Sequence, residues 1–130
     1  MIVVDASVII EVLAGDEMGD MISARLAEHV GALVAPEVFE LETIQTLRRL
    51  VRSGRVSAAT ARQGFDVLED LRILRFSHAP LRERVWALRD NLTAYDAAYF
   101  ALAEALDVPL WTRDAKFADV PGSNAAVELI

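Results

Sequence analysis

Residues 2–5 read Ile-Val-Val-Asp, a run of β-branched apolar side chains that ends in a carboxylate. Such a run predicts a short buried strand, because a strand covered on both faces has no polar positions. Further strands are predicted over residues 32–35, 73–76, 109–112 and 125–129.

Helical segments are predicted between these strands. Ser7 is expected to cap the first helix, Pro36 to lie in the first turn of the third, and Thr93 to begin the last. Strands that alternate with helices indicate an α/β fold with a parallel sheet covered on both faces, in one domain over residues 1–130. The helices are predicted over residues 7–13, 17–30, 36–52, 57–71, 80–89 and 94–106.

The composition excludes several classes of protein. The chain has 130 residues, no cysteine and only two histidines, which excludes disulfide scaffolds, zinc–thiolate sites and multi-histidine metal sites. No apolar run is long enough to cross a membrane, and the N-terminus lacks the basic region of a signal peptide. We therefore expect a cytoplasmic domain.

Although the net charge is −7, the middle of the chain contains a basic segment. A local basic stripe binds phosphate even on an acidic protein, although a solvated helix face is the alternative interpretation. The residues concerned lie between Glu42 and Asp66 with no acid among them, and they are Arg48, Arg49, Arg52, Arg55 and Arg62.

Two aspartates come at the ends of predicted strands. Asp5 follows the first strand directly, and Asp114 comes two residues after Thr112, at the end of the fourth. Each has a structural alternative as a helix cap or an Asx-turn. Because right-handed crossovers bring the carboxyl ends of parallel strands to one edge, we expect the two carboxylates to share that edge.

Two further acids lie on predicted helices. Asp96 falls on the apolar stripe of its helix, where a charge is costly without a partner, although it also completes a capping box with Thr93. Glu42 lies on one narrow arc of its helix together with Gln45, Thr46 and Arg49. Its structural alternative is a surface contact with Arg49.

Together the acids Asp5, Glu42, Asp96 and Asp114 predict a metal site. Carboxylates about 6 Å apart repel by about 3 kcal/mol per pair at an effective dielectric of about 20. That cost is large against a total stability of about 5–15 kcal/mol unless a divalent cation offsets it. Oxygen ligands select Mg²⁺ or Mn²⁺, which suit phosphodiester hydrolysis.

The chain resembles the PIN-domain ribonucleases, and among them the VapC toxins of VapBC toxin–antitoxin pairs. The resemblance spans essentially the whole chain, and each of its pieces is short. The first segment that carries it is residues 2–7 (Ile-Val-Val-Asp-Ala-Ser), and the second is Ala35-Pro36 followed by Glu42 and residues 47–49. Further along the chain come residues 95–99 (Tyr-Asp-Ala-Ala-Tyr), residues 101–103 and residues 112–114 (Thr-Arg-Asp).

The resemblance implies a three-layer α/β/α domain with four or five parallel strands. It also implies a Mg²⁺- or Mn²⁺-dependent endoribonuclease that cuts tRNA, rRNA or mRNA to block translation, leaving a 5′-phosphate and a 3′-hydroxyl. Ser7 and Thr112 would support the acidic site, while Gln45 stands where the family often has asparagine. Arg48, Arg49, Arg52 and Arg55 would hold the RNA.

The family further implies a homodimer and a VapB-type antitoxin, in a heterotetramer or hetero-octamer. Two other functions stay open. One is a non-catalytic PIN-like module that binds RNA or protein without metal. The other is a phosphatase of the haloacid dehalogenase type, against which Ser7 counts, because it occupies the position of that family's second acid.

Overall fold

The computed structural model describes residues 1–130 and contains one five-stranded sheet. All four strand pairings are parallel, as expected, and β1 lies at the centre of the order β3-β2-β1-β4-β5. The strands are β1 (Ile2–Val4), β2 (Leu33–Pro36), β3 (Leu74–Phe76), β4 (Leu110–Thr112) and β5 (Val127–Leu129).

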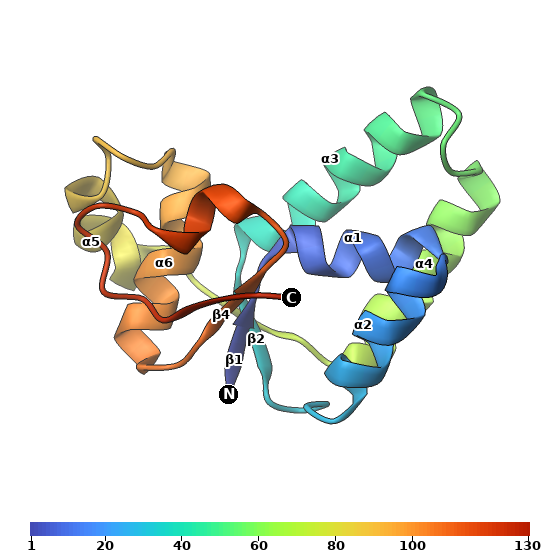
Figure 1. Cartoon of the computed structure of the whole chain (residues 1–130). Helices are drawn as coiled ribbons and strands as arrows, with labels where there is room; N and C mark the ends of the chain where they lie inside the picture. Colours follow the sequence, from blue (N-terminus) through green and yellow to red (C-terminus); the bar gives the residue numbers. More distant parts are fainter.

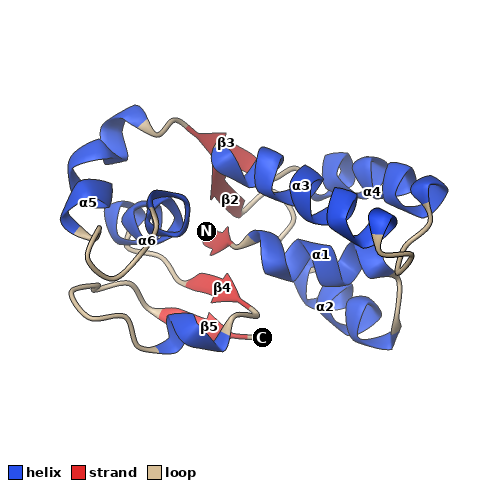
Figure 2. Cartoon of the chain, turned by 90° about the horizontal axis from the view of Figure 1, so that it is seen from above, coloured by secondary structure: helices blue, strands red, loops and turns tan.

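Helices cover both faces of this sheet, which gives the three-layer arrangement predicted from the sequence. Figure 2 shows α1 to α4 on one side of the strands and α5 and α6 on the other. The helices are α1 (Ala6–Ala14), α2 (Glu17–Ala27), α3 (Val38–Arg52), α4 (Ala58–Leu71), α5 (Arg82–Ala87) and α6 (Ala94–Leu106), with short 3₁₀ segments η1 (Ala79–Leu81) and η2 (Ala115–Ala118).

The core lies where α1 and α6 pack on the two central strands. Every residue of β1 and β4 is buried, and Tyr99 and Phe100 of α6 are fully covered. On the other side α1 packs against α2, where a Cβ on Gly19 would lie 2.3 Å from the carbonyl oxygen of Glu11. Only glycine allows these two helices to approach so closely.

Several predicted boundaries were wrong. Ser7 lies inside α1 and does not cap it, because Asp5 takes the N-cap position. Pro36 ends β2 and does not start α3, whose first residue is Val38. The second helix stops at Ala27, short of the predicted Val30, and the segment over residues 80–89 divides into η1 and α5.

The last helix agrees with its prediction. Thr93 is the N-cap of α6, its Oγ1 accepts a hydrogen bond from the Asp96 amide, and the helix ends at Leu106. Ser57 caps α4 in the same way. No helix of the chain combines the length and the apolar character that a membrane span requires.

Candidate active site

Asp5 lies at the carboxyl end of the central strand β1, beside the end of β4. Its amide donates to the carbonyl oxygen of Trp111, which continues the pairing of the two strands. The residue is only 7% exposed, and its Oδ2 accepts hydrogen bonds from Ser7 Oγ at 2.6 Å and Thr112 Oγ1 at 2.8 Å. Asp5 occupies the N-cap position of α1 but makes no side-chain cap bond, so its carboxylate is not used as a cap.

Backbone amides fix the orientation of both hydroxyls. Arg113 N donates to Ser7 Oγ at 3.0 Å, and Asp114 N donates to Thr112 Oγ1 at 3.0 Å. Each hydroxyl therefore accepts from the backbone of residues 113–114 and donates to Asp5. Ser7 and Thr112 thus lie where the supporting polar groups were expected.

Glu42 points from α3 toward the same region and is held by Tyr99. The phenol of Tyr99 donates to Glu42 Oε2 at 2.5 Å, and it joins α3 to α6. Glu42 makes no ion pair with Arg49, whose guanidinium donates to Thr46 instead, so the surface-contact alternative is wrong.

Tyr99 is the one contact of the four acids with a core side chain that the sequence did not predict. It falls on the buried stripe of α6, where an aromatic ring is typical of the core. The only signal was its hydroxyl, since a buried tyrosine usually finds a hydrogen-bond partner. Burial and the neighbouring charge of Glu42 raise the pKa of the Tyr99 phenol, so it stays a donor at neutral pH.

Asp96 lies in the first turn of α6 and is half-buried. Thr93 caps this turn by accepting a hydrogen bond from the Asp96 backbone amide at 3.2 Å, and its hydroxyl also lowers the pKa of the Asp96 carboxyl. Burial raises the pKa of that carboxyl, and repulsion from Asp5 raises it further. The cap and a functional carboxylate are therefore compatible at this residue.

Asp114 follows β4 and also has a structural role. Its Oδ1 accepts from the Lys116 amide at 3.0 Å and caps η2, as the structural alternative predicted. Its Oδ2 lies 3.5 Å from the Lys116 ammonium. One oxygen of Asp114 thus accepts from the backbone, and the other pairs with the exposed ammonium of Lys116.

The four acids act on one another electrostatically. Burial raises the pKa of Asp5, and the charge of Asp114 raises it further. Burial also raises the pKa of Glu42, and the charges of Asp5 and Asp96 add to this effect. Asp5 is the common member, since its charge acts on both Glu42 and Asp96. No group of three or more Asp, Glu or His side chains is already arranged to hold a metal ion. Three of the side chains instead engage local donors: hydroxyls at Asp5, a phenol at Glu42, and the amide and ammonium of Lys116 at Asp114.

Gln45 and the arginines at positions 48, 49, 52 and 55 form no hydrogen bond or ion pair with the four acids. Gln45 is exposed. Figure 1 shows α3 extending outward from the sheet, with its C-terminal end farthest from the strands. Arg48, Arg49, Arg52 and Arg55 are all exposed on the C-terminal half of α3 and the turn after it.

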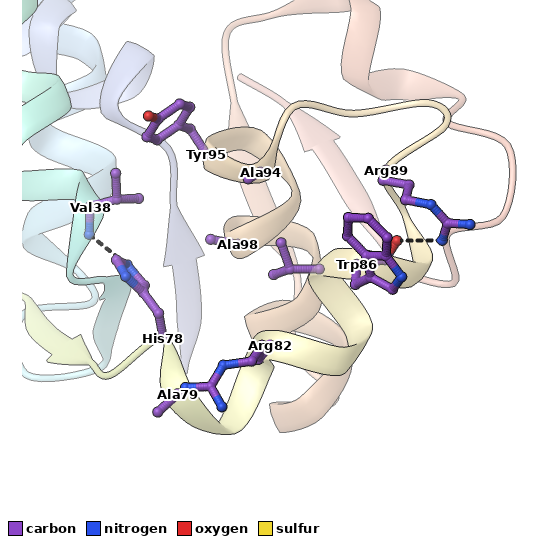
Figure 3. A pocket seen from close by; sticks show the side chains of 10 residues that line it. Val38, His78, Ala79, Arg82, Trp86, Arg89, Ala94, Tyr95 and Ala98 are labelled. Atoms are coloured by element: carbon purple, nitrogen blue, oxygen red, sulfur yellow. Dashed lines mark hydrogen bonds between the residues drawn. The ribbon is translucent and has the colours of Figure 1, made fainter.

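A separate, largely apolar cavity of about 470 Å³ lies on the other side of the α6 N-terminus. Figure 3 shows Tyr95 and Trp86 on its wall, with His78 accepting a 2.9 Å hydrogen bond at Nε2 from the Val38 amide. His78 therefore caps the first turn of α3, the helix that carries Glu42. None of the four acids lines this cavity.

The PIN domain family model matches residues 2–123. The chain belongs to the PIN-domain family. This PIN domain is 40% identical to ribonuclease VapC1 of Mycobacterium tuberculosis over 129 residues, which cover 98% of this chain and 96% of the relative. It is 35% identical to ribonuclease VapC9 of the same species over 130 residues, with 100% and 98% coverage.

Solved structures share the fold of this PIN domain. PAE2754 from Pyrobaculum aerophilum gives a TM-score of 0.70 at 26% identity, covering 97% of this chain and 81% of that one. VapBC2 from Rickettsia felis, bound to a promoter DNA fragment, gives 0.73 at 15% identity, covering 99% and 98%. The family assignment favours a nuclease over a phosphatase of the haloacid dehalogenase type.

Proposed function

We propose that this PIN domain is an endoribonuclease toxin of the VapC type that requires Mg²⁺ or Mn²⁺. The observation that carries the proposal is the buried carboxylate of Asp5 at the carboxyl end of the central strand. Its Oδ2 is held by two hydroxyls, and its charge acts on Glu42 and Asp96. The ribonuclease names of relatives at 35–40% identity support the same conclusion.

The donor set fits a hard divalent cation. Asp5, Glu42, Asp96 and Asp114 would hold it, and all offer oxygen, the ligand type that Mg²⁺ and Mn²⁺ prefer. Three of the four carboxyls have raised pKa values from burial and mutual repulsion, a cost that bound positive charge relieves. The chemistry supplied by such a cation is polarisation of the phosphoryl oxygen and stabilisation of the leaving oxygen.

The residues of the chain prepare the site in three ways. Ser7 and Thr112 hold the Asp5 carboxylate through hydrogen bonds, and Tyr99 holds the Glu42 carboxylate in the same way. The exposed guanidinium groups of Arg48, Arg49, Arg52 and Arg55 would neutralise backbone phosphates of the RNA. One carboxylate of the four acids would accept the proton of the attacking water with the help of the cation, because no histidine lies among these acids.

The partners follow from the same family placement. We propose a VapB-type antitoxin, because the structures that share this fold include VapBC2 of Rickettsia felis and FitAcB of Neisseria gonorrhoeae. The protein would form a homodimer, which would assemble with the antitoxin into a heterotetramer or hetero-octamer. The substrate would be tRNA, rRNA or mRNA, which places the activity in the cytoplasm.

One assay separates this function from that of a non-catalytic module. Structured RNAs are incubated with the protein in EDTA, Mg²⁺, Mn²⁺ or Zn²⁺, and the products are resolved on a denaturing gel. We expect cleavage with Mg²⁺ or Mn²⁺, little with Zn²⁺, and none with EDTA or with Asp5→Asn. Binding without cleavage under every condition would favour the module and overturn the nuclease.

A further inference from the structure

Lys116 holds a unique position among the cations of the chain. It is the only lysine, and the only cation that forms an ion pair with one of the four site acids. Its backbone amide donates to Asp114 Oδ1, and its ammonium lies 3.5 Å from Asp114 Oδ2. The short segment η2 thus carries a positive charge to the edge of the carboxylate group.

A surface cavity of about 250 Å³ lies between Lys116 and the N-terminus of α6. Asp96 and Thr93 line one side of it, while Lys116 and Phe117 come from η2. The pKa of Asp96 is raised mainly by burial and Asp5, and the charge of Lys116 acts in the opposite direction. Lys116 pairs with Asp114 and lines the same cavity as Asp96.

Stability does not account for this lysine. Its side chain is 82% exposed, and an ion pair so exposed contributes little to the fold. A polyanion approaching the carboxylates, in contrast, needs a nearby cation to offset their repulsion. The ammonium is a compact charge on a flexible stem with three donors, which suits a phosphate group.

We propose that Lys116 binds RNA, its ammonium donating to a backbone phosphate of a strand that crosses the cavity between α6 and η2. This inference rests on the proposed function and adds to it a contact beside the reacting phosphodiester. The contact would position the strand against Asp5 and Asp96. It is separate from the arginines at positions 48, 49, 52 and 55, which lie on α3 and the turn after it.

The test compares Lys116→Ala and Lys116→Arg with a matched charge control, Arg72→Asn. Arg72 is exposed and precedes β3, so it lies at the sheet edge opposite the acids, and asparagine tolerates its positive φ of 51°. Binding of a short fluorescent single-stranded RNA of mixed sequence is followed by anisotropy in EDTA at several salt concentrations. The Mg²⁺-dependent cleavage kinetics of each variant are then measured.

We expect Lys116→Ala to weaken binding several-fold and to reduce the slope of log K against log salt by about 0.7, which corresponds to one phosphate on a single strand. KM should rise several-fold with little change in kcat, and Lys116→Arg should restore both. If Lys116→Ala matches Arg72→Asn in slope and KM while the wild type binds and cleaves RNA, the proposed lysine–phosphate contact is wrong. If the wild type neither binds nor cleaves RNA, the proposed function fails with it.

Discussion

The phenol of Tyr99 on α6 donates a 2.5 Å hydrogen bond to Oε2 of Glu42 on α3, and so joins helices from opposite faces of the sheet. The carboxylate of Glu42 is held toward Asp5 by a residue that is itself fully buried. The hydrogen bond thus sets the orientation of the Glu42 carboxylate.

Tyr99→Phe tests this relationship. The ring keeps its packing, so we expect the free energy of unfolding to fall by no more than about 1.5–3 kcal/mol, the range for a hydrogen bond to a charged group. Cleavage should fall about tenfold, because Glu42 loses the donor that orients it. Thermal unfolding and steady-state kinetics measure the two effects, and unchanged kinetics would show that Glu42 does not need the phenol.

Asp96→Asn separates the functional role of this residue from its structural one. The cap of α6 uses the Asp96 backbone amide, which the variant keeps. We expect no detectable cleavage and a melting temperature equal to or above that of the wild type, because repulsion from Asp5 is relieved. Thr93→Ala, the matched control, should lose about 1 kcal/mol of stability through the cap. A large drop in melting temperature for Asp96→Asn would support the capping role instead.

The stability gain of Asp96→Asn should depend on pH. Burial and Asp5 raise the pKa of Asp96 in the folded protein, so the folded state binds its proton more tightly than the unfolded state. The Asp96 carboxyl therefore makes its full contribution to the free energy of unfolding below its ordinary pKa. This contribution is lost as the pH rises through the pKa of Asp96 in the folded state. Urea unfolding in EDTA, measured at several pH values from about 4 upward, should show the variant gaining on the wild type as the pH rises above the ordinary aspartate pKa. A difference that stays constant over this range would contradict the raised pKa.

Neutralising Arg48, Arg49 and Arg52 together should weaken RNA binding. All three are exposed and form no ion pair with an acid, so they are available to phosphates. The salt slope for a single strand should flatten by about 0.7 for each phosphate that the protein no longer neutralises. Anisotropy titrations of the triple glutamine variant measure this slope. An unchanged slope would show that the stripe is a solvated helix face.

The sequence predicted the sheet because its strands are short, apolar and bounded by helices with recognisable ends. Thr93 marked the start of α6 because a threonine at that position accepts from the helix backbone, and the structure shows that bond. The common edge of Asp5 and Asp114 followed from the handedness of parallel crossovers. These predictions depended on local chemistry and on general rules of topology.

The errors arose where tertiary contacts override local preference. Ser7 has the residue type of a cap, but its hydroxyl donates to Asp5 and accepts from Arg113, a residue far along the chain. Pro36 suits a first helical turn, but pairing with Phe76 extends β2 through it. Tyr99 has the position of an ordinary core residue, because it lies on the apolar stripe of α6 and only its hydroxyl is polar. Such roles depend on partners that no sequence window contains.

Divalent-cation binding tests the central claim most directly, that Asp5, Glu42, Asp96 and Asp114 form one metal site. Mn²⁺ and Mg²⁺ are titrated calorimetrically into the wild type, Asp5→Asn and the distant surface control Asp70→Asn, with melting temperatures measured in parallel. We expect binding and thermal stabilisation in the wild type and the control, and loss of both in Asp5→Asn. Equal binding by all three proteins, or cleavage that survives excess EDTA, would contradict the account.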